Sequence, residues 1–357
     1  MQLAVPATDR MDPARSAASI NRPVAAWLFC LCGMILVMVS LGGATRLTGS
    51  GLSIMEWAPL MGTLPPLSEA EWRRLYALYQ NIPQYGLVNR GFGLDGFKGI
   101  FWLEWTHRLW GRLTALAFLL PMAWFALRGA IPARLAGRLA LFFALGGLQG
   151  AVGWFMVSSG FAAGSTAVSA YRLVVHLVLA LALYGAILWT ALSLWQARPS
   201  PFVPGLRGWL AASCALLGLT IVAGGFVAGL RAGLTYNTFP LMDGRLIADG
   251  YGSLRPFLLN WTENIAAVQF NHRLLATLTA LLVGGTVAYG LCRSADAALR
   301  RALLAMGGLV LAQYALGVTT LLLVVPVALG TLHQAVAVLL LTSALVALHR
   351  QPATRRR

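Results

Sequence analysis

The chain contains two similar stretches, each of which opens a long apolar segment and carries a histidine. Residues 104–109 read EWTHRL and include His107, and residues 269–274 read QFNHRL and include His272. Of the five histidines in the chain, two more, His176 and His333, lie inside later apolar segments at equivalent places in the two halves. A hydrophobic chain that places two histidines in each of two repeated halves is suited to hold two flat cofactors between imidazole pairs. Haem is the leading candidate.

The composition indicates an integral membrane protein. Apolar residues make up 58% of the chain and charged residues 11%, and the mean hydropathy is +0.72. A soluble globular protein is about half apolar and a quarter charged. The net charge of +16 would suit nucleic acid, but the arginines cluster in short connectors between apolar segments, as the positive-inside rule expects. We therefore expect membrane lipid as a partner and no nucleic acid.

The apolar segments predict eight transmembrane helices, because each span needs about 20 mostly apolar residues. The polar stretch 1–23 precedes the first segment, which is too long for the core of a signal peptide and is read as a retained helix. A very short connector at Val325 and Pro326 predicts a tight hairpin between the last two helices. The predicted spans are about 24–43, 108–127, 136–157, 171–194, 209–229, 273–292, 301–323 and 328–348.

The arginine distribution predicts the orientation of the spans. Arginines occupy the connectors after the second, fourth and sixth spans, the C-terminal tail and the N-terminal stretch, which includes Arg10. In contrast, the connector 158–170 and the last connector have neither Lys nor Arg. Both termini are therefore expected in the cytoplasm, with the protein spanning the cell inner (plasma) membrane. The long loops 44–107 and 230–272 then face outward.

The repeat divides the chain into a cytoplasmic tail 1–23, an N-terminal half 24–200, a C-terminal half 201–348 and a basic tail 349–357. Gly42-Gly43 and Gly224-Gly225 introduce the outer loops of the two halves, and the run at 146–149 aligns loosely with 307–313. Four helices per half is an even number, so both halves enter the membrane from the same side. The predicted fold is an all-α integral membrane protein of two tandem four-helix bundles, related by a pseudo-twofold axis along the membrane normal.

This topology places the four repeated histidines near one membrane surface. His107 and His272 are expected at the outer ends of the second and sixth helices, and His176 and His333 one to two turns into the fourth and eighth. One pair then forms in each bundle. Zinc or copper would need further ligands, and no carboxylate or cysteine recurs beside both pairs. A lone membrane histidine more often makes a hydrogen-bonded helix contact, and His349 in the basic tail is expected to be solvated.

The residues around the first histidine of each pair add two hypotheses. Arg108 and Arg273 follow these histidines and could contact haem propionates, or they could extend toward the membrane interface. Glu104 stands three residues before His107 where the other half has Gln269. If the helix extends that far, Glu104 shares a face with His107 and can act as acid, base or electrostatic stabiliser. The asymmetry suggests one reactive site and one electron-transfer site; the alternative is an exposed loop carboxylate.

At these residues the chain resembles the haem A synthase family, whose members make haem A for cytochrome c oxidase. The resemblance covers about residues 24–348. It is carried by residues 42–53 (GGATRLTGSGLS), 104–112, 229–240, 269–273 and 333–334. Some bacterial members carry a cysteine pair in the first outer loop. This chain has no cysteine between 44 and 107, so it resembles the alphaproteobacterial and mitochondrial branch.

The resemblance implies an activity and a role for each half. Family members oxidise the C8 methyl of haem O to a formyl group by successive hydroxylations, with water as the implied oxygen source. His272 and His333 would ligate a haem b cofactor, His107 and His176 would flank the iron of haem O, and Glu104 would be the catalytic carboxylate. Haem O synthase and the cytochrome c oxidase assembly machinery are the implied partners.

Two other functions use the same features. A di-haem b electron-transfer cytochrome linked to quinol would need the same four histidines, and a transporter with a repeat of four plus four helices would show broken helices at mid-membrane. The Glu104 and Gln269 asymmetry favours the enzyme over a symmetric electron-transfer protein.

Overall fold

A computed structural model of the chain describes residues 13–58, 61–195 and 199–354. The described part is helical apart from turns, loops and an isolated bridge between Met242 and Arg245. Eight of its helices are long and apolar enough to cross a membrane, which confirms the predicted number. The spanning helices are α1 (Pro13–Leu47), α4 (Gly93–Leu127), α5 (Ala133–Ser158), α6 (Ala170–Leu194), α7 (Leu206–Gly229), α9 (Ile265–Arg293), α10 (Ala297–Leu322) and α11 (Val327–Arg350). The short helices are α2 (Glu69–Gln80), α3 (Pro83–Leu87) and α8 (Asn260–Glu263).

Three helices begin two turns or more before the start that the hydropathy pattern predicts. Helix α1 starts at Pro13, inside the predicted polar tail, α4 starts at Gly93 instead of about 108, and α9 starts at Ile265 instead of about 273. Charged residues such as Asp95 and Lys98 lower the hydropathy of the added turns. A helix satisfies its own backbone hydrogen bonds and can therefore continue past the lipid. The arginines at 10 and 355–357, which we expect in the cytoplasm, lie outside the described residues.

The helix starts follow local capping chemistry. Ser68 before α2, Asn264 before α9 and Asp296 before α10 each accept a hydrogen bond from a backbone N–H in the first turn. Such caps satisfy donors that have no partner within the helix. The predicted tight hairpin between α10 and α11 is also present, with Val324 and Val325 at φ 59° and 57°, a left-handed conformation that β-branched residues rarely adopt.

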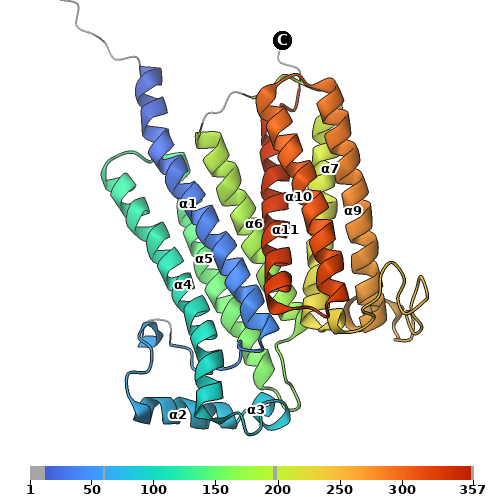
Figure 1. Ribbon diagram of the computed structural model, residues 1–357. Coiled ribbons are helices and arrows are strands. Elements are labelled where there is room, and N and C mark those ends of the chain that lie inside the picture. Colours follow the sequence, from blue (N-terminus) through green and yellow to red (C-terminus); the bar gives the residue numbers. More distant parts are fainter. Residues whose placement is uncertain (1–12, 59–60, 196–198, 355–357) are drawn as a thin grey trace, which may run out of the picture.

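The spanning helices pack mainly with partners from the same half of the chain. Helices α1, α4, α5 and α6 contact one another in the N-terminal half, and α7, α9, α10 and α11 do so in the C-terminal half. The halves meet where α1 contacts α11 and where α6 contacts both α7 and α11. The start of α1 and the end of α11 lie at one end of the bundle, and α2 and α3 lie across the opposite end (Figure 1). We call that opposite end, with residues 48–92 and 230–264, the loop end.

Each part has its own buried apolar cluster. Leu28, Leu139 and Ile187 belong to the cluster of the N-terminal half. Leu206, Leu303 and Met306 belong to that of the C-terminal half. At the loop end, Trp72 and Tyr79 of α2 pack with Phe97 and Phe101 of the extended α4. This third cluster holds the first turns of α4 in place at the loop end and so positions the residues around Glu104.

Candidate functional site

All four repeated histidines lie on helices that begin at the loop end. His176, His272 and His333 each lie about two turns from the start of α6, α9 and α11. His107 lies about four turns from the start of α4, because α4 projects beyond the others. The prediction that His107 and His272 occupy helix ends is therefore wrong, since both lie inside continuous helix. His107 and His176 are close enough to interact electrostatically, as are His272 and His333.

Each of these histidine rings packs against a glycine of a neighbouring helix. A β-carbon added to Gly153, Gly224 or Gly317 would lie 2.9 Å from Cε1 of His176, His272 or His333 respectively. That separation is shorter than real side chains show, so the three rings require glycine. Gly42 faces His107 in the same way, but an added β-carbon there would lie 3.4 Å from Nε2. The repeated contact leaves the imidazoles of both halves in matched surroundings.

The hydrogen bonds of the rings differ within the C-terminal pair. Nδ1 of His272 lies 3.2 Å from the carbonyl oxygen of Thr220, a contact that fixes the proton on Nδ1 and leaves Nε2 free for a metal. Nδ1 of His176 and Nδ1 of His333 are buried with no partner in the described part of the chain. Among the described residues no three His, Cys, Asp or Glu converge on a metal-sized site. The donor set is therefore paired imidazoles, which suits a haem iron with two axial ligands.

Two glutamines that the sequence reasoning left without a role lie beside the second histidine of each pair. Nε2 of Gln149 lies 3.4 Å from Nε2 of His176, and Nε2 of Gln313 lies 3.4 Å from Nε2 of His333. In both cases the glutamine precedes the contacting glycine by four residues, as in Gln149 and Gly153. This repeated spacing could have identified the two glutamines from the sequence. It aligns Gln149 with Gln313 in the repeat, whereas the looser alignment matched Gly146-Gly147 with Gly307-Gly308.

Glu104 is buried and holds the first loop onto α4. Its Oε2 accepts hydrogen bonds from the backbone N–H of Ser53 (2.8 Å), the hydroxyl of Ser53 (2.8 Å) and the backbone N–H of Ile54 (2.9 Å). Its Oε1 accepts from Nε (3.0 Å) and Nη2 (2.6 Å) of Arg108. The alternative of an exposed loop carboxylate is therefore wrong. The carboxylate is 2% exposed, and an ion pair compensates for the cost of burying it.

Arg108 extends this arrangement toward the surface of the loop end. It also donates to the carbonyls of Ile54 and Glu56. The side chain of Glu56 in turn accepts two hydrogen bonds from Arg74, and this guanidinium holds the pKa of Glu56 below its usual range. The described donors of Arg108 are thus directed at protein oxygens.

Gln269 and Arg273 form the matching arrangement in the C-terminal half. Nε2 of Gln269 donates to the carbonyls of Ala232 and Thr235, and its Oε1 accepts from Nη2 of Arg273 at 2.9 Å. Arg273 also donates to the backbone carbonyls of residues 236, 238 and 241. We call Glu104 with Arg108 the first clamp and Gln269 with Arg273 the second clamp. Each fixes the loop that follows the first helix of its half.

The glycine doublets also join the two halves. In α1, Gly43 contacts the amide of Gln334, the residue that follows the α11 histidine. In α7, a β-carbon on Gly225 would lie 3.5 Å from Cδ2 of Leu177, the residue that follows the α6 histidine. In each doublet, the first glycine therefore contacts a histidine of its own half, and the second glycine contacts a residue of the other half. Only the contact at Gln334 is polar.

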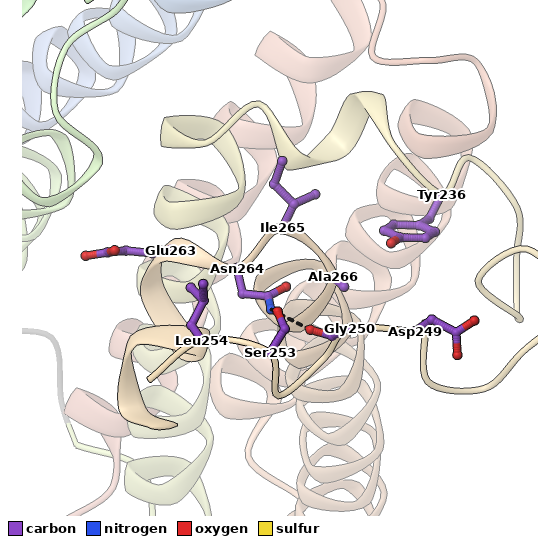
Figure 2. A pocket seen from close by; sticks show the side chains of 9 residues that line it. All are labelled: Tyr236, Asp249, Gly250, Ser253, Leu254, Glu263, Asn264, Ile265 and Ala266. Carbon is purple, nitrogen blue, oxygen red and sulfur yellow. Dashed lines mark hydrogen bonds between the residues drawn. The ribbon is translucent and has the colours of Figure 1, made fainter. Parts of the chain in front are cut away.

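Two further features lie outside the histidine pairs. His349 is half-buried: its ring lies edge-on to Trp189 with the ring centres 4.9 Å apart, and its Nε2 lies 3.1 Å from the hydroxyl of Ser193 at an exposed position. At the loop end a cavity of about 330 Å³ opens beside the start of α9. Figure 2 shows Glu263 and Tyr236 on opposite sides of this cavity and Asn264 between them. No histidine lines it, so the cavity is separate from the paired imidazoles.

Comparison with known proteins identifies relatives along almost the whole chain. A family of cytochrome oxidase assembly proteins matches residues 25–345. The haem A synthase of Granulibacter bethesdensis is 64% identical over 328 residues, which are 91% of this chain and 86% of that protein. The haem A synthase of Rhodospirillum centenum is 48% identical over 349 residues, covering 96% of this chain and 92% of that protein. That of Nitrosospira multiformis is 46% identical over 335 residues, covering 92% and 93%.

Proposed function

The chain belongs to the haem A synthase family, the oxidoreductases that convert haem O to haem A, and we propose that its two halves divide this reaction. The N-terminal half, 24–200, takes the substrate haem O, and the C-terminal half, 201–348, holds a haem b. The halves are related by a pseudo-twofold axis along the membrane normal. The repeated glycine–histidine contacts and the two matched clamps support this relation.

In the C-terminal half, His272 and His333 would hold the iron of a haem b. The hydrogen bond between Nδ1 of His272 and Thr220 supports this assignment, because it presents Nε2 as an unprotonated ligand. A bound haem b supplies one-electron transfer at this position. The glycines at 224 and 317 let the rings approach their neighbouring helices without steric clash, and a fixed ring orientation favours a permanent cofactor.

In the N-terminal half, His107 and His176 flank the iron of haem O. The C8 methyl is oxidised to a formyl group by successive hydroxylations with water as the oxygen source, which releases four protons and four electrons, and an external electron acceptor takes up the electrons. Removing electrons from that carbon develops positive charge. The side chain of Glu104, three residues before His107 in the same helix and paired with Arg108, stabilises this charge in a site of low dielectric constant. Five hydrogen bonds already engage its two oxygens, so few lone pairs are left to accept a proton. Glu104 therefore suits electrostatic stabilisation better than proton abstraction.

One observation carries this division of roles. The two clamps occupy equivalent places in the repeat, and each contains an arginine. The first clamp pairs its arginine with a carboxylate, and the second pairs its arginine with a neutral amide. A symmetric di-haem cytochrome has no need for this difference. An enzyme with a reactive haem in one half and an electron-transfer haem in the other requires different electrostatics at the two sites.

The same proposal includes orientation and partners. The loop end faces outward from the cell inner membrane and both termini are cytoplasmic, as the arginine-rich connectors at the other end favour. Haem O reaches the N-terminal half from haem O synthase, and haem A passes to the cytochrome c oxidase assembly machinery.

The assignment of the halves is tested by replacing single histidines and analysing the extracted pigments. His272→Ala and His333→Ala should remove the low-spin b-type spectrum while the protein still inserts in the membrane. His107→Ala and His176→Ala should keep that spectrum and produce no haem A. His349→Ala is the matched control, because its ring contacts α6 and lies outside both pairs. An unchanged reduced-minus-oxidised spectrum in either C-terminal variant would show that haem b lies elsewhere.

A further inference from the structure

Arg46, in the last turn of α1, is a cation with few partners. Its Nη2 donates to the backbone carbonyl of Gly229 at 2.9 Å, at the end of α7. Its Nε is shielded from solvent and has no hydrogen-bond partner in the described part of the chain. Arg231, two residues beyond Gly229, lies close enough to repel it. Among the described residues, no ion pair joins Arg46 or Arg231 to a carboxylate.

Other arginines of the loop end are better compensated. Arg74 and Arg108 form ion pairs with carboxylates. The Nε of Arg273 also has no acceptor, but its two terminal nitrogens donate to four oxygens. A partly buried guanidinium beside a second positive charge is unfavourable unless an anion accompanies it. The position of Arg46 therefore indicates that an anionic group binds there.

The helical geometry of α1 directs Arg46 toward the proposed substrate site. Gly42 contacts His107, and Gly43 contacts Gln334 of the other half. At 100° per residue, Arg46 points about 40° from the direction of Gly42 and about 60° from that of Gly43. It therefore faces the interior, about one turn closer to the loop end than the His107 contact. The corresponding position in α7, four residues after Gly224, is Ala228, so the cation belongs to the N-terminal half alone.

We propose that Arg46, assisted by Arg231, binds a propionate carboxylate of the haem held in the N-terminal half. This inference rests on the proposed function, which places haem O between His107 and His176. The propionates are the anionic groups of haem O, and a guanidinium binds a carboxylate through two parallel hydrogen bonds. Iron ligation at His107 and propionate binding one turn nearer the loop end would orient the macrocycle. The propionate edge then faces the aqueous surface.

The test compares two probes on the purified full-length protein with its resident haem b. Ferric haem O and its dimethyl ester, in which both propionates are capped, are titrated while the Soret absorbance is followed. The parent should bind the free acid at least tenfold more tightly than the ester. Arg46→Met should bring the two affinities within about twofold, and Arg46→Lys should retain part of the preference. Arg90→Met is the control, because Arg90 is exposed at the loop end and should leave the preference unchanged.

Three outcomes would overturn the inference. Equal weakening of acid and ester in Arg46→Met would mean that Arg46 only braces α1 against α7. An unchanged preference in a variant that keeps its low-spin haem b spectrum would mean that the propionates bind elsewhere. If Arg46→Met instead loses binding to phosphatidylglycerol vesicles with the preference intact, the anion is a lipid phosphate. His107→Ala tests the proposed function separately, since unaltered haem O binding there would remove haem O from this half.

Discussion

The first and second clamps have the same design but different charge. Glu104 with Arg108 is formally neutral, whereas Gln269 with Arg273 carries one positive charge. The loops they hold also differ in polarity: Glu104 accepts from the N–H groups of its loop, and Gln269 donates to carbonyls. A duplicated scaffold can thus keep its geometry while one substitution changes the electrostatics of one site. The neutral first clamp opposes developing positive charge less than the cationic second clamp does, and the cationic clamp favours a reduced haem.

The side chains that join the first two spanning helices also differ between the halves. Helices α7 and α9 are joined by hydroxyl pairs, Ser213 with Thr286 and Thr220 with Thr279, and small residues let membrane helices approach closely. Helices α1 and α4 are joined by indoles, with Trp27 and Trp110 donating to backbone carbonyls. Only 6% of the most apolar window of α4 is buried, against 22% for α9. The open side of the N-terminal half at α4 suits a substrate that enters and leaves.

The largest expected effect comes from removing the charge of the first clamp. Glu104→Gln should lower haem A formation at least a hundredfold, about 2.7 kcal/mol of transition-state stabilisation, and haem O or a hydroxylated intermediate should accumulate. Haem b should remain bound. The measurement is extraction and chromatography of haems from membranes with equal amounts of protein.

Ser53→Ala separates charge from loop holding in that experiment. It removes one hydrogen bond from Glu104 and keeps the carboxylate, so its activity should stay within tenfold of the parent. If Ser53→Ala reduces haem A formation as strongly as Glu104→Gln, then Glu104 acts by positioning the loop. Parental activity in Glu104→Gln would make the first clamp purely structural.

Glycine replacements beside the first histidine of each pair should damage the two halves unequally. Gly224→Ala forces a contact of 2.9 Å on His272, whose ring is held by Thr220, and overpacking of this kind costs about 1–3 kcal/mol. The low-spin haem b absorbance should fall and the melting temperature should drop. Gly42→Ala meets His107 at 3.4 Å, a contact that a small shift relieves. Equal losses of bound haem b and of thermal stability in the two variants would contradict this difference.

Making the clamps alike should shift the haem b potential. Gln269→Glu introduces a negative charge beside Arg273 and should lower the midpoint potential by tens of mV, as expected for one charge acting through protein of effective dielectric constant about 20. Spectroelectrochemical titration measures the shift. Gln80→Glu adds the same charge on exposed α2 and should move the potential much less, and an equal shift in both would indicate a general surface-charge effect.

The smallest effect concerns the hydroxyl pairs between α7 and α9. A double-mutant cycle of Ser213→Ala and Thr286→Val should give a coupling of about 0.6 kcal/mol, typical of hydrogen bonds between membrane helices. Reversible unfolding in mixed detergent measures it. A coupling near zero would mean that close packing alone joins these helices.

The sequence alone predicted the class of protein and the eight spans, and it singled out four histidines as candidate ligands. Hydropathy suffices for this because a spanning helix must satisfy its backbone internally and present about 20 apolar residues to lipid. The repeat singled out His107 and His272 because the same residue types recur around them. Their pairing with His176 and His333 followed from counting helices. The early starts of α4 and α9 were missed, because hydropathy reports lipid contact and not helix formation. Charged residues lie in the first turns of α4, and the mostly polar stretch 269–273 follows the first turn of α9.

Only the tertiary structure decided what surrounds these residues. Sequence spacing placed Glu104 near His107, but the folding of residues 53–54 back onto α4 buries it and gives its oxygens five hydrogen bonds. Likewise, the sequence offered Arg108 as a possible propionate contact, and only the fold shows that it donates to protein oxygens and that no carboxylate among the described residues forms an ion pair with Arg46. A one-dimensional pattern fixes which face of a helix a residue occupies. Which partners meet that face depends on loops and on helices distant in the chain, whose contacts no local pattern specifies.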